Sequence, residues 1–212
     1  MSSQPTVVPR GRHAPPLEVR REVQLERLFA AAASVFSRGG YADASAEGIS
    51  REAGMSKATF YEHFANKEEC LLALFDRARD EALAAIRAAV ETAPADPHER
   101  TRAGVRALLG IVALRPEPAR TLLVEVVGAG PVAQARRDEV LEAFADFLVR
   151  ESETDARRGS VTAFSEDEAY AVVGAIVELI SRQLRTGRPE RIEELEPVIE
   201  RLLFAMLPPG GG

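Results

Sequence analysis

Apolar side chains recur at helical spacing along almost the whole chain. They are separated by steps of three and four residues, and no stretch alternates between apolar and polar residues as a β-strand would. Glycine, proline and small polar residues interrupt this pattern at intervals. The sequence therefore predicts an all-α fold, with a short helix between Ser45 and Gly54 and further helices over residues 19–38, 57–64, 67–91, 98–113, 119–127, 132–151, 166–185 and 197–207.

The expected helix boundaries follow from local chemistry. Gly39 and Gly40 should stop the first helix, Pro116 and Pro118 should precede the helix over 119–127, and residues 152–164 should form a polar loop. Side chains that can accept the first free backbone N–H groups stand before four helices, at Ser45, Ser56, Asn66 and Ser165, the last with Glu168 as its capping-box partner.

Residues 45–67 predict two short helices, a tight turn and the start of a third helix. Gly54 can adopt the left-handed conformation that ends the first of them. In the second helix, Phe60 and Phe64 lie one turn apart and should face inward. The outward strip consists of Lys57, Ala58, Tyr61 and Glu62. This pattern predicts a helix-turn-helix whose second helix would enter a DNA major groove, and an ordinary helical hairpin is the alternative.

The motif AGMSKATFYEHFANKEE at residues 53–69 resembles the DNA-binding motif of the TetR family of bacterial one-component repressors. The family pattern is Ala-Gly-hydrophobic-Ser, then Thr-hydrophobic-Tyr, then His-Phe, then Lys-Glu. The chain matches it in order and spacing at Ala53, Gly54, Met55, Ser56, Thr59, Phe60, Tyr61, His63, Phe64, Lys67 and Glu68. The resemblance is sharp from about Val19 to Phe75, and beyond it only length and helical pattern agree.

The resemblance implies two parts: an N-terminal three-helix helix-turn-helix DNA-binding domain and a C-terminal helical ligand-binding and dimerisation domain. We expect a disordered N-terminal arm over 1–18, the DNA-binding domain over 19–66, the C-terminal domain over 67–207 and a flexible tail over 208–212. Arg10 and Arg12 of the arm could reach an adjacent minor groove. The alternative is an arm that contacts nothing.

The resemblance also implies a set of DNA-binding residues: Ser56, Lys57, Ala58, Thr59, Tyr61, His63 and Lys67. The family places phosphate contacts at Thr59, Tyr61, His63 and Lys67, and base contacts at Lys57, Ala58 and Tyr61. Lys57 can reach guanine, and Ala58 or the Tyr61 ring can touch a thymine methyl group. Lys67 stands at a helix N-terminus, which attracts phosphate. Glu62 fits poorly, because a carboxylate repels phosphates; it could accept from cytosine or pair with a nearby cation.

A C-terminal pocket for a small molecule is a further implication of the resemblance. The candidate lining residues are Leu108, Val112, Leu122, Glu125, Val126, Phe144, Phe147, Val172 and Ile176, with Glu178 and Gln183 as possible polar anchors. Each could equally be part of an ordinary core. Glu125 interrupts an apolar run; if it lies inside, it needs a polar or cationic ligand group or a partner such as Arg120 or Arg182.

The last two helices have apolar faces wider than a single core contact requires. Such a surface left in water would invite aggregation. We therefore expect two copies to pack about a twofold axis as a four-helix bundle, as in the TetR family. The expected interface residues are Val173, Val177, Ile180, Leu184, Ile199, Leu202, Leu203 and Met206. The alternative is that both helices only cap the chain's own core.

Charge and composition narrow the class of protein. The 212 residues carry a net charge of −6, but residues 1–67 carry +2 and the remainder −8, which favours nucleic-acid binding by the N-terminal part. No apolar run approaches the roughly 20 residues that span a bilayer. Residues 1–16 lack the apolar segment of a secretory signal. Together with the single Cys70, these features favour a cytoplasmic location and no internal disulfide.

An enzymatic function has little support in the sequence. His13, His63 and His98 stand in separate segments without metal-ligand spacing. No glycine-rich phosphate loop or nucleophile elbow occurs. We therefore expect no catalytic residues, no metal site and no cofactor.

Taken together, these patterns predict a homodimeric, ligand-responsive transcriptional regulator that binds a double-stranded DNA operator. The expected mode is repression, released when a small, mainly apolar effector binds and the helix over 67–91 transmits the change. One alternative is a DNA-binding dimer without a ligand, controlled by its expression or by a protein partner, which a closed C-terminal core would favour. An enzyme is the remote alternative.

Overall fold

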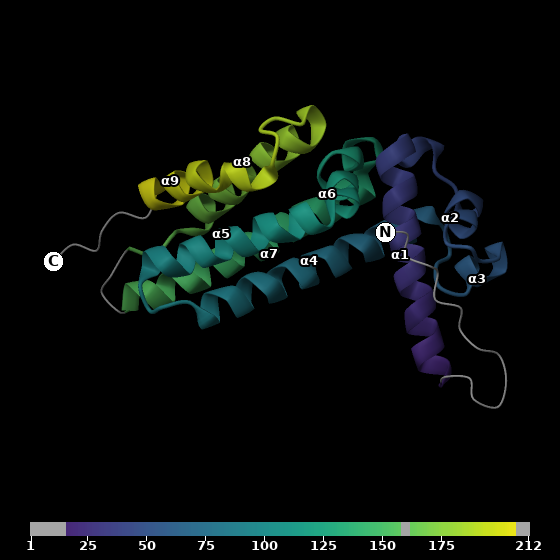
Figure 1. Ribbon diagram of the computed structural model, residues 1–212, viewed down its shortest axis with the longest axis horizontal. Helices are drawn as coiled ribbons and strands as arrows, with labels where there is room; N and C mark the ends of the chain where they lie inside the picture. Colours follow the sequence, from purple (N-terminus) through teal and green to yellow (C-terminus); the bar gives the residue numbers. More distant parts are fainter. Residues whose placement is uncertain (1–15, 158–161, 207–212) are drawn as a thin grey trace.

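The computed structural model describes residues 16–157 and 162–206 and confirms the all-α fold (Figure 1). The helices are α1 (Leu17–Asp43), α2 (Ala46–Glu52), α3 (Lys57–Tyr61), α4 (Lys67–Thr92), α5 (Pro97–Leu114), α6 (Pro116–Leu123), α7 (Pro131–Arg157), α8 (Glu166–Thr186) and α9 (Glu196–Met206). Two short 3₁₀ helices, η1 (Glu125–Gly128) and η2 (Ile192–Leu195), precede α7 and α9. No strand occurs within the described residues. None of the described helices is long and apolar enough to cross a membrane.

The helices form two parts. Helices α1, α2 and α3 lie together at one end of the molecule, where α1 runs across the ends of the longer helices (Figure 1). Helix α4 packs along α5 and α7, while α8 and α9 form a layer on the side away from α4. Helix α6 and η1 contact α1. The two parts are therefore joined by the chain through α4 and by packing through α6.

Two main apolar clusters form the core. The N-terminal cluster is centred on α1, with Phe36 and Phe60 fully buried, and extends to Phe75 of α4 and Val126 of η1. The second cluster joins α5, α7, α8 and α9. The N-terminal core thus continues past residue 66, the expected domain boundary, because α4 and η1 complete it. The predicted arm residues Arg10 and Arg12 and the tail over 208–212 lie outside the described residues.

All four predicted N-caps are confirmed. The side-chain oxygens of Ser45, Ser56, Asn66 and Ser165 accept backbone N–H groups at 3.1, 3.1, 2.9 and 3.3 Å, respectively. Glu168 completes the capping box by accepting from the Ser165 N–H at 2.9 Å. These contacts satisfy donors that a helix start leaves without intrahelical partners.

Several predicted helix ends need correction. Gly40, with φ of 72°, does interrupt α1, but the chain continues for another turn to Asp43. Helix α3 ends at Tyr61 rather than at Phe64. Pro116 and Pro118 lie inside the first turn of α6 rather than before it. Proline is tolerated there because the first helical N–H groups have no intrahelical acceptor.

The largest correction concerns α7, which continues to Arg157 through residues expected to form a loop. Ser152 and Asp155 are only 5% and 7% exposed. The Nε atom of Arg100 on α5 lies 3.3 Å from Asp155 Oδ1, and its Nη2 atom lies 2.5 Å from Glu151 Oε2. Asp155 is thus paired with another helix, and the Ser152 hydroxyl donates to the carbonyl oxygen of Val149 at 2.8 Å, so their polarity did not mark a loop.

Candidate DNA interface and effector cavity

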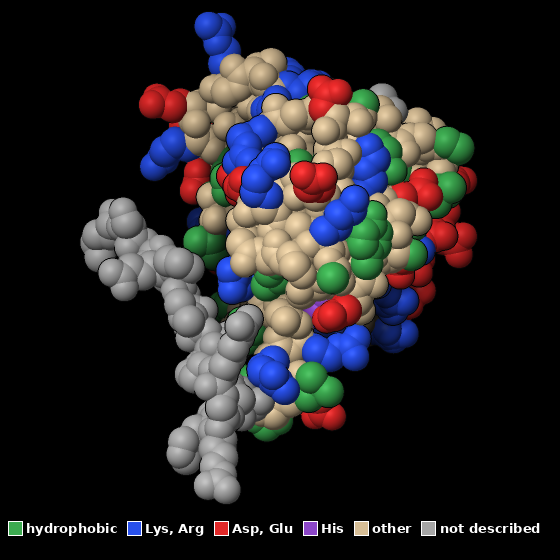
Figure 2. All heavy atoms as spheres, turned by 90° about the vertical axis from the view of Figure 1, so that its right-hand side faces the viewer, with side chains coloured by type: hydrophobic (Ala, Val, Ile, Leu, Met, Phe, Trp, Pro, Cys, Tyr) green, Lys and Arg blue, Asp and Glu red, His purple; other side chains and the backbone are tan. Residues whose placement is uncertain are grey.

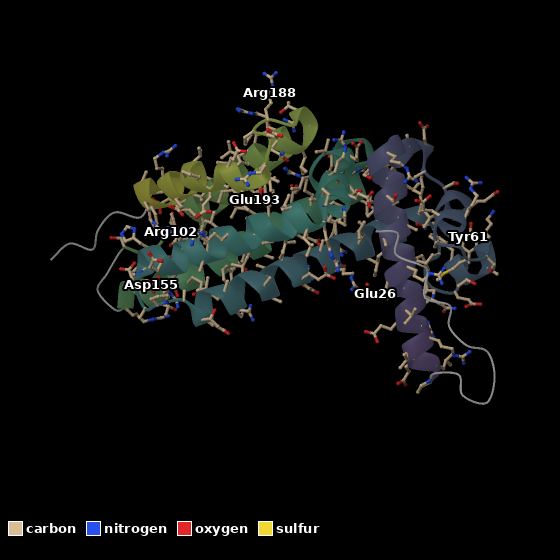
Figure 3. The ribbon with its side chains drawn as sticks, in the orientation of Figure 1. Glu26, Tyr61, Arg102, Asp155, Arg188 and Glu193 are labelled. Carbon is tan, nitrogen blue, oxygen red and sulfur yellow. The ribbon has the colours of Figure 1, made fainter. Side chains whose placement is uncertain are left out.

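The outward strip of α3 is exposed as predicted. Phe60 is fully buried and Phe64 is 4% exposed, whereas Tyr61 is 50% exposed and points away from the molecule (Figure 3). Lys57 and Ala58 are exposed beside it. The Lys57 Nζ atom lies 5.9 Å from the centre of the Tyr61 ring. The strip therefore combines a hydrogen-bond donor, a methyl group and a ring, which suit base edges in a major groove.

The turn between α2 and α3 is fastened to α1. Arg27 donates to the carbonyl oxygen of Ala53 at 2.6 Å. The next residue, Gly54, has φ of 64°, and a Cβ atom there would lie 3.1 Å from the Arg27 guanidinium, so both backbone conformation and space favour glycine. Arg38 pairs with Glu52 at 3.0 Å, and this hydrogen bonding lowers the pKa of Glu52. Helix α1 and the helix-turn-helix are thus held as one unit.

Lys67 lies in a different environment from the one predicted. Its ammonium group donates to the carbonyl oxygens of Tyr41, Ala42 and Ala44 at 2.8, 3.1 and 2.9 Å, and lies 4.4 Å from the centre of the Tyr41 ring. An ammonium group has three protons, and these contacts use all of them. Lys67 therefore caps the carbonyl oxygens at the C-terminal end of α1, and a phosphate contact would require it to leave these carbonyls.

His63 is also engaged within the chain. Its Nε2 atom lies 3.3 Å from Gln24 Oε1 on α1. Partial burial, followed by the charge of Arg21, lowers the pKa of His63. The ring is therefore neutral at neutral pH and offers no positive charge to a phosphate. The hydroxyl groups of Ser56 and Thr59, by contrast, lie 2.9 Å apart near the surface at the start of α3.

Two arginines of α1 lie close to α3 although the sequence analysis did not single them out. Arg20 and Arg21 line a surface depression together with Gln24 and Glu62. Glu62, the residue that fitted poorly with a DNA-facing role, therefore shares this depression with two arginines. The Arg-Arg pair was visible in the sequence, but only folding places it beside α3. The face of the molecule at this end carries Lys and Arg side chains with Asp and Glu among them (Figure 2).

The C-terminal part contains a cavity of about 850 Å³. Its wall is formed mainly by apolar side chains of α4 to α8, and it reaches Phe29 and Ala33 of α1. Six of the predicted residues line it: Leu108, Val112, Leu122, Phe144, Phe147 and Ile176. The core is therefore not closed, which was the condition that would have favoured a regulator without a ligand.

Three of the predicted lining residues lie elsewhere. Val126 and Val172 are each 1% exposed and are packed in the N-terminal and C-terminal clusters, respectively. Glu125 points to Arg120, whose Nε atom lies 3.5 Å from Glu125 Oε1. The pair satisfies the carboxylate without a ligand, as the alternative for Glu125 anticipated.

The suggested polar anchors also lie away from the cavity wall. Glu178 pairs with Arg185 at 2.7 Å, and the Gln183 side chain donates to the carbonyl oxygen of Pro189 at 3.2 Å. Several charged residues that line the cavity were not predicted, among them Glu26, Arg77, Glu81 and Arg115. Arg77 and Glu81 lie one turn apart on α4, but Glu26 and Arg115 come from other segments, so spacing along one helix could not reveal the whole group.

The expected dimer face also needs correction. Val173, Ile180, Ile199 and Leu203 are 8%, 2%, 0% and 4% exposed within the single chain, so they belong to its own core. The apolar faces of α8 and α9 are wide because these helices pack on α5, α6, α7 and each other. Val177, Leu184, Leu202 and Met206 are only partly buried. The large apolar residues that α8 and α9 expose are Tyr170 and Val198.

Sequence comparisons connect this geometry to known proteins. Residues 28–74 match the family described as bacterial regulatory proteins, tetR family. The chain is 29% identical over 147 residues to the HTH-type transcriptional activator FasR of Mycolicibacterium smegmatis, which covers 68% of this chain and 67% of FasR. It is 34% identical over 116 residues to the HTH-type transcriptional regulator EthR of the same organism. This alignment covers 54% of this chain and 52% of EthR. The second alignment thus spans about half of that relative.

Solved structures share the fold over most of the chain. FadR from Bacillus halodurans superimposes with a TM-score of 0.76 at 20% identity, covering 85% of this chain and 94% of FadR. FadR from Bacillus subtilis, solved in complex with stearoyl-CoA, superimposes with a TM-score of 0.74 at 17% identity. The superposition covers 84% of this chain and 96% of that FadR. At these identities the likeness concerns the fold. The family match over residues 28–74 and the two regulators show a DNA-binding transcriptional regulator that carries a TetR-family DNA-binding domain.

Proposed function

We propose that this regulator occupies its operator as a homodimeric repressor and leaves the DNA when a small molecule with a long apolar chain fills the cavity. The observation that carries this proposal is the cavity of about 850 Å³ that extends to α1. Its volume lies within the roughly 300–1,000 Å³ of typical ligand pockets. A ligand there would contact both the C-terminal helices and the helix that carries the DNA-binding motif.

For DNA recognition, we assign base contacts to Lys57, Ala58 and Tyr61. Their side chains are exposed on one strip of α3. We assign phosphate contacts to Ser56 and Thr59, whose hydroxyl groups lie at the start of the same helix. Such contacts set the position of a helix on DNA, whereas base contacts select the sequence. His63 and Lys67 then have a structural role: His63 contacts Gln24, and Lys67 donates to carbonyl oxygens at the end of α1.

For the effector, we propose a single-chain amphiphile such as a fatty-acyl compound. The wall of the cavity is mostly apolar, and Phe144 and Phe147 lie along it. An apolar wall binds an alkyl chain by removing it from water. The fold neighbour FadR from Bacillus subtilis was solved with stearoyl-CoA, which supports a long-chain ligand.

For assembly, we propose that α8 and α9 of two copies pack together through their outward sides. Tyr170 and Val198 are exposed to 41% and 40%, and Leu202, one turn from Val198 on α9, is partly buried. A dimer places two copies of α3 on one operator, so each operator would contain two half-sites. The regulator would act in the cytoplasm, where the DNA of a bacterium lies.

The test is direct binding to an operator selected from a random DNA library, followed by fluorescence anisotropy. Tyr61→Ala should lower operator affinity by about 1–3 kcal/mol and leave the melting temperature unchanged, because its side chain is half exposed. Dodecanoyl-CoA should raise the melting temperature and weaken operator binding. If neither this nor any related long-chain compound does so, the ligand-free alternative is correct.

A further inference from the structure

A chain of ion pairs runs along the end of the cavity next to α1. Arg77 of α4 pairs with Glu26 of α1, and its Nε atom lies 2.8 Å from Glu81 Oε1. Arg115, at the junction of α5 and α6, places Nη1 2.9 Å from the other carboxylate oxygen of Glu81. All four residues line the cavity. The ion pairs therefore connect α1, α4 and the α5–α6 junction beside the space where an effector would sit.

Arg77 occupies the central position in this chain. Its guanidinium carbon lies 5.3 Å from the centre of the Phe29 ring, and its side chain is 28% exposed. Glu26 lies in the angle between α1 and α4 (Figure 3), with 44% of its side chain exposed. Within residues 16–157 and 162–206, Glu26–Arg77 is the only ion pair between α1 and α4. It therefore joins α1 to α4 at the cavity, while the hydrogen bonds of Lys67 and the N-terminal apolar cluster join the same helices elsewhere.

The two carboxylates of this chain differ in how firmly they are held. Glu81 lies one turn from Arg77 on the same helix and also pairs with Arg115. Glu26 comes from another helix, pairs with Arg77 alone and is the more exposed of the two. An anion that approaches Arg77 and Arg115 from the cavity would therefore displace Glu26 before Glu81, because exposed pairs are the weaker ones.

We propose that the anionic head group of the effector binds Arg77 and Arg115, displaces Glu26 from Arg77 and so lets α1 shift against α4 at the cavity end. This inference rests on the proposed function, since it requires the apolar chain of the ligand to occupy the cavity. The head group is a carboxylate or a phosphate, both of which arginine binds through paired hydrogen bonds. Because the contacts of Arg27 and Arg38 hold the helix-turn-helix on α1, a shift of α1 changes the orientation of α3.

The experiment compares three probes that share one chain but differ in their head group: dodecanoate, dodecanoyl-CoA and the neutral dodecanol. With the wild-type chain, all three should raise the melting temperature. The anionic probes should lower affinity for the selected operator by about fivefold or more, at the lower end of typical allosteric coupling because the displaced pair is partly exposed. Dodecanol should change it by less than about twofold. An effect of dodecanoyl-CoA alone would identify phosphate as the anion recognised.

The decisive variant is Glu26→Gln, with Glu22→Gln as its matched control on α1. Glu22 is exposed and has no ion pair among the described residues. Glu26→Gln should bind operator more weakly without any probe, and dodecanoate should change that affinity by less than about twofold while still raising the melting temperature. Glu22→Gln should behave as the wild type. Arg77→Gln should lose the difference between dodecanoate and dodecanol in the melting-temperature shift.

Two results would overturn the inference and leave the proposed function intact. One is a release of operator by dodecanol as strong as that by dodecanoate. The other is a response of Glu26→Gln to dodecanoate equal to that of the wild type. If none of the three probes raises the melting temperature of the wild type, the cavity does not take the chain, and the proposed function fails together with this inference.

Discussion

Aromatic residues in the two parts of the molecule have different surroundings. In the DNA-binding part, Phe36, Phe60 and Phe64 are at most 4% exposed and lie outside the cavity wall, and the Phe60 and Phe64 rings lie 5.5 Å apart. In the C-terminal part, Phe144 and Phe147 line a cavity of about 850 Å³. The first group of rings fills a core, and the second group borders the cavity.

The difference assigns distinct mechanical roles to the two parts. A filled core holds α2 and α3 in one geometry, which DNA recognition requires because half-sites have fixed spacing. Atoms that face a cavity lack contact partners on one side and lose dispersion energy, which a ligand can restore. The shape of the first part is therefore set by the chain itself, whereas that of the second depends on what it binds.

The largest expected effect tests this contrast with one substitution in each part. Phe60→Ala should destabilise the fold by about 3–5 kcal/mol, because Phe60 is fully buried. Phe144→Ala should cost less than about 2 kcal/mol, since its ring already borders the cavity. Urea unfolding measures both. Equal losses would mean that the two cores are packed alike.

The two lysines of the chain sharpen the contrast between a structural and a DNA-binding role. Lys67→Met should lower stability by about 2 kcal/mol, because its ammonium group holds three carbonyl oxygens at the end of α1. Lys57→Met should change stability by less than about 0.5 kcal/mol, since Lys57 is exposed.

The second readout for the lysines is operator binding. Lys57→Met should weaken it by about 1–3 kcal/mol and reduce its salt dependence. Urea unfolding and anisotropy at several salt concentrations separate the two roles. A fully stable Lys67→Met variant with weakened, less salt-dependent DNA binding would show that Lys67 contacts phosphate, as the motif predicts.

A smaller effect is expected from filling the cavity. Val112→Phe should raise stability by about 0.5–2 kcal/mol and reduce the melting-temperature shift caused by dodecanol, because Val112 lines the cavity. Val172→Phe is the matched control. Val172 is 1% exposed and lies outside the cavity wall, so the same substitution should destabilise by about 1–3 kcal/mol. Destabilisation by both variants would show that the volume near Val112 is not available.

The smallest effect concerns the pH dependence of the DNA-binding part. The pKa of His63 is lowered below its ordinary value of 6.5, so the unfolded chain binds the proton more readily than the folded one. The stability contributed by the neutral ring is therefore complete above about pH 6.5 and is lost as the pH falls below it. Partial exposure of the ring keeps the effect small. Urea unfolding of the wild type and His63→Gln across this range should show a shallower decline for the variant.

Features that depend on residues close in sequence were predictable. The Ser56 cap, the left-handed Gly54 and the inward direction of Phe60 each involve only neighbours within a turn or two of helix. Backbone sterics and helical periodicity determine such features. The same locality explains why the outward strip of α3 was predicted, with Tyr61 as its most prominent side chain.

The contacts that the sequence did not indicate arise where a side chain meets a partner from a distant segment. Lys67 carries the expected residue type, but its three acceptors lie 23 to 26 positions earlier in the chain. Ser152 and Asp155 were expected in a loop, but both are buried in α7, where Asp155 pairs with Arg100. Polarity in the sequence does not reveal whether water or another side chain will satisfy a polar group.

The sequence by itself therefore determined the all-α fold, the helix-turn-helix and the exposed residues of α3, because each follows from local periodicity and capping. Only the tertiary structure decided the cavity, the ion pairs of Arg77 and the burial of Ile199 and Leu203 within one chain. An apolar stripe shows that a helix face must be covered, but not whether another helix, a second copy or a ligand covers it. That choice depends on how helices far apart in sequence pack together.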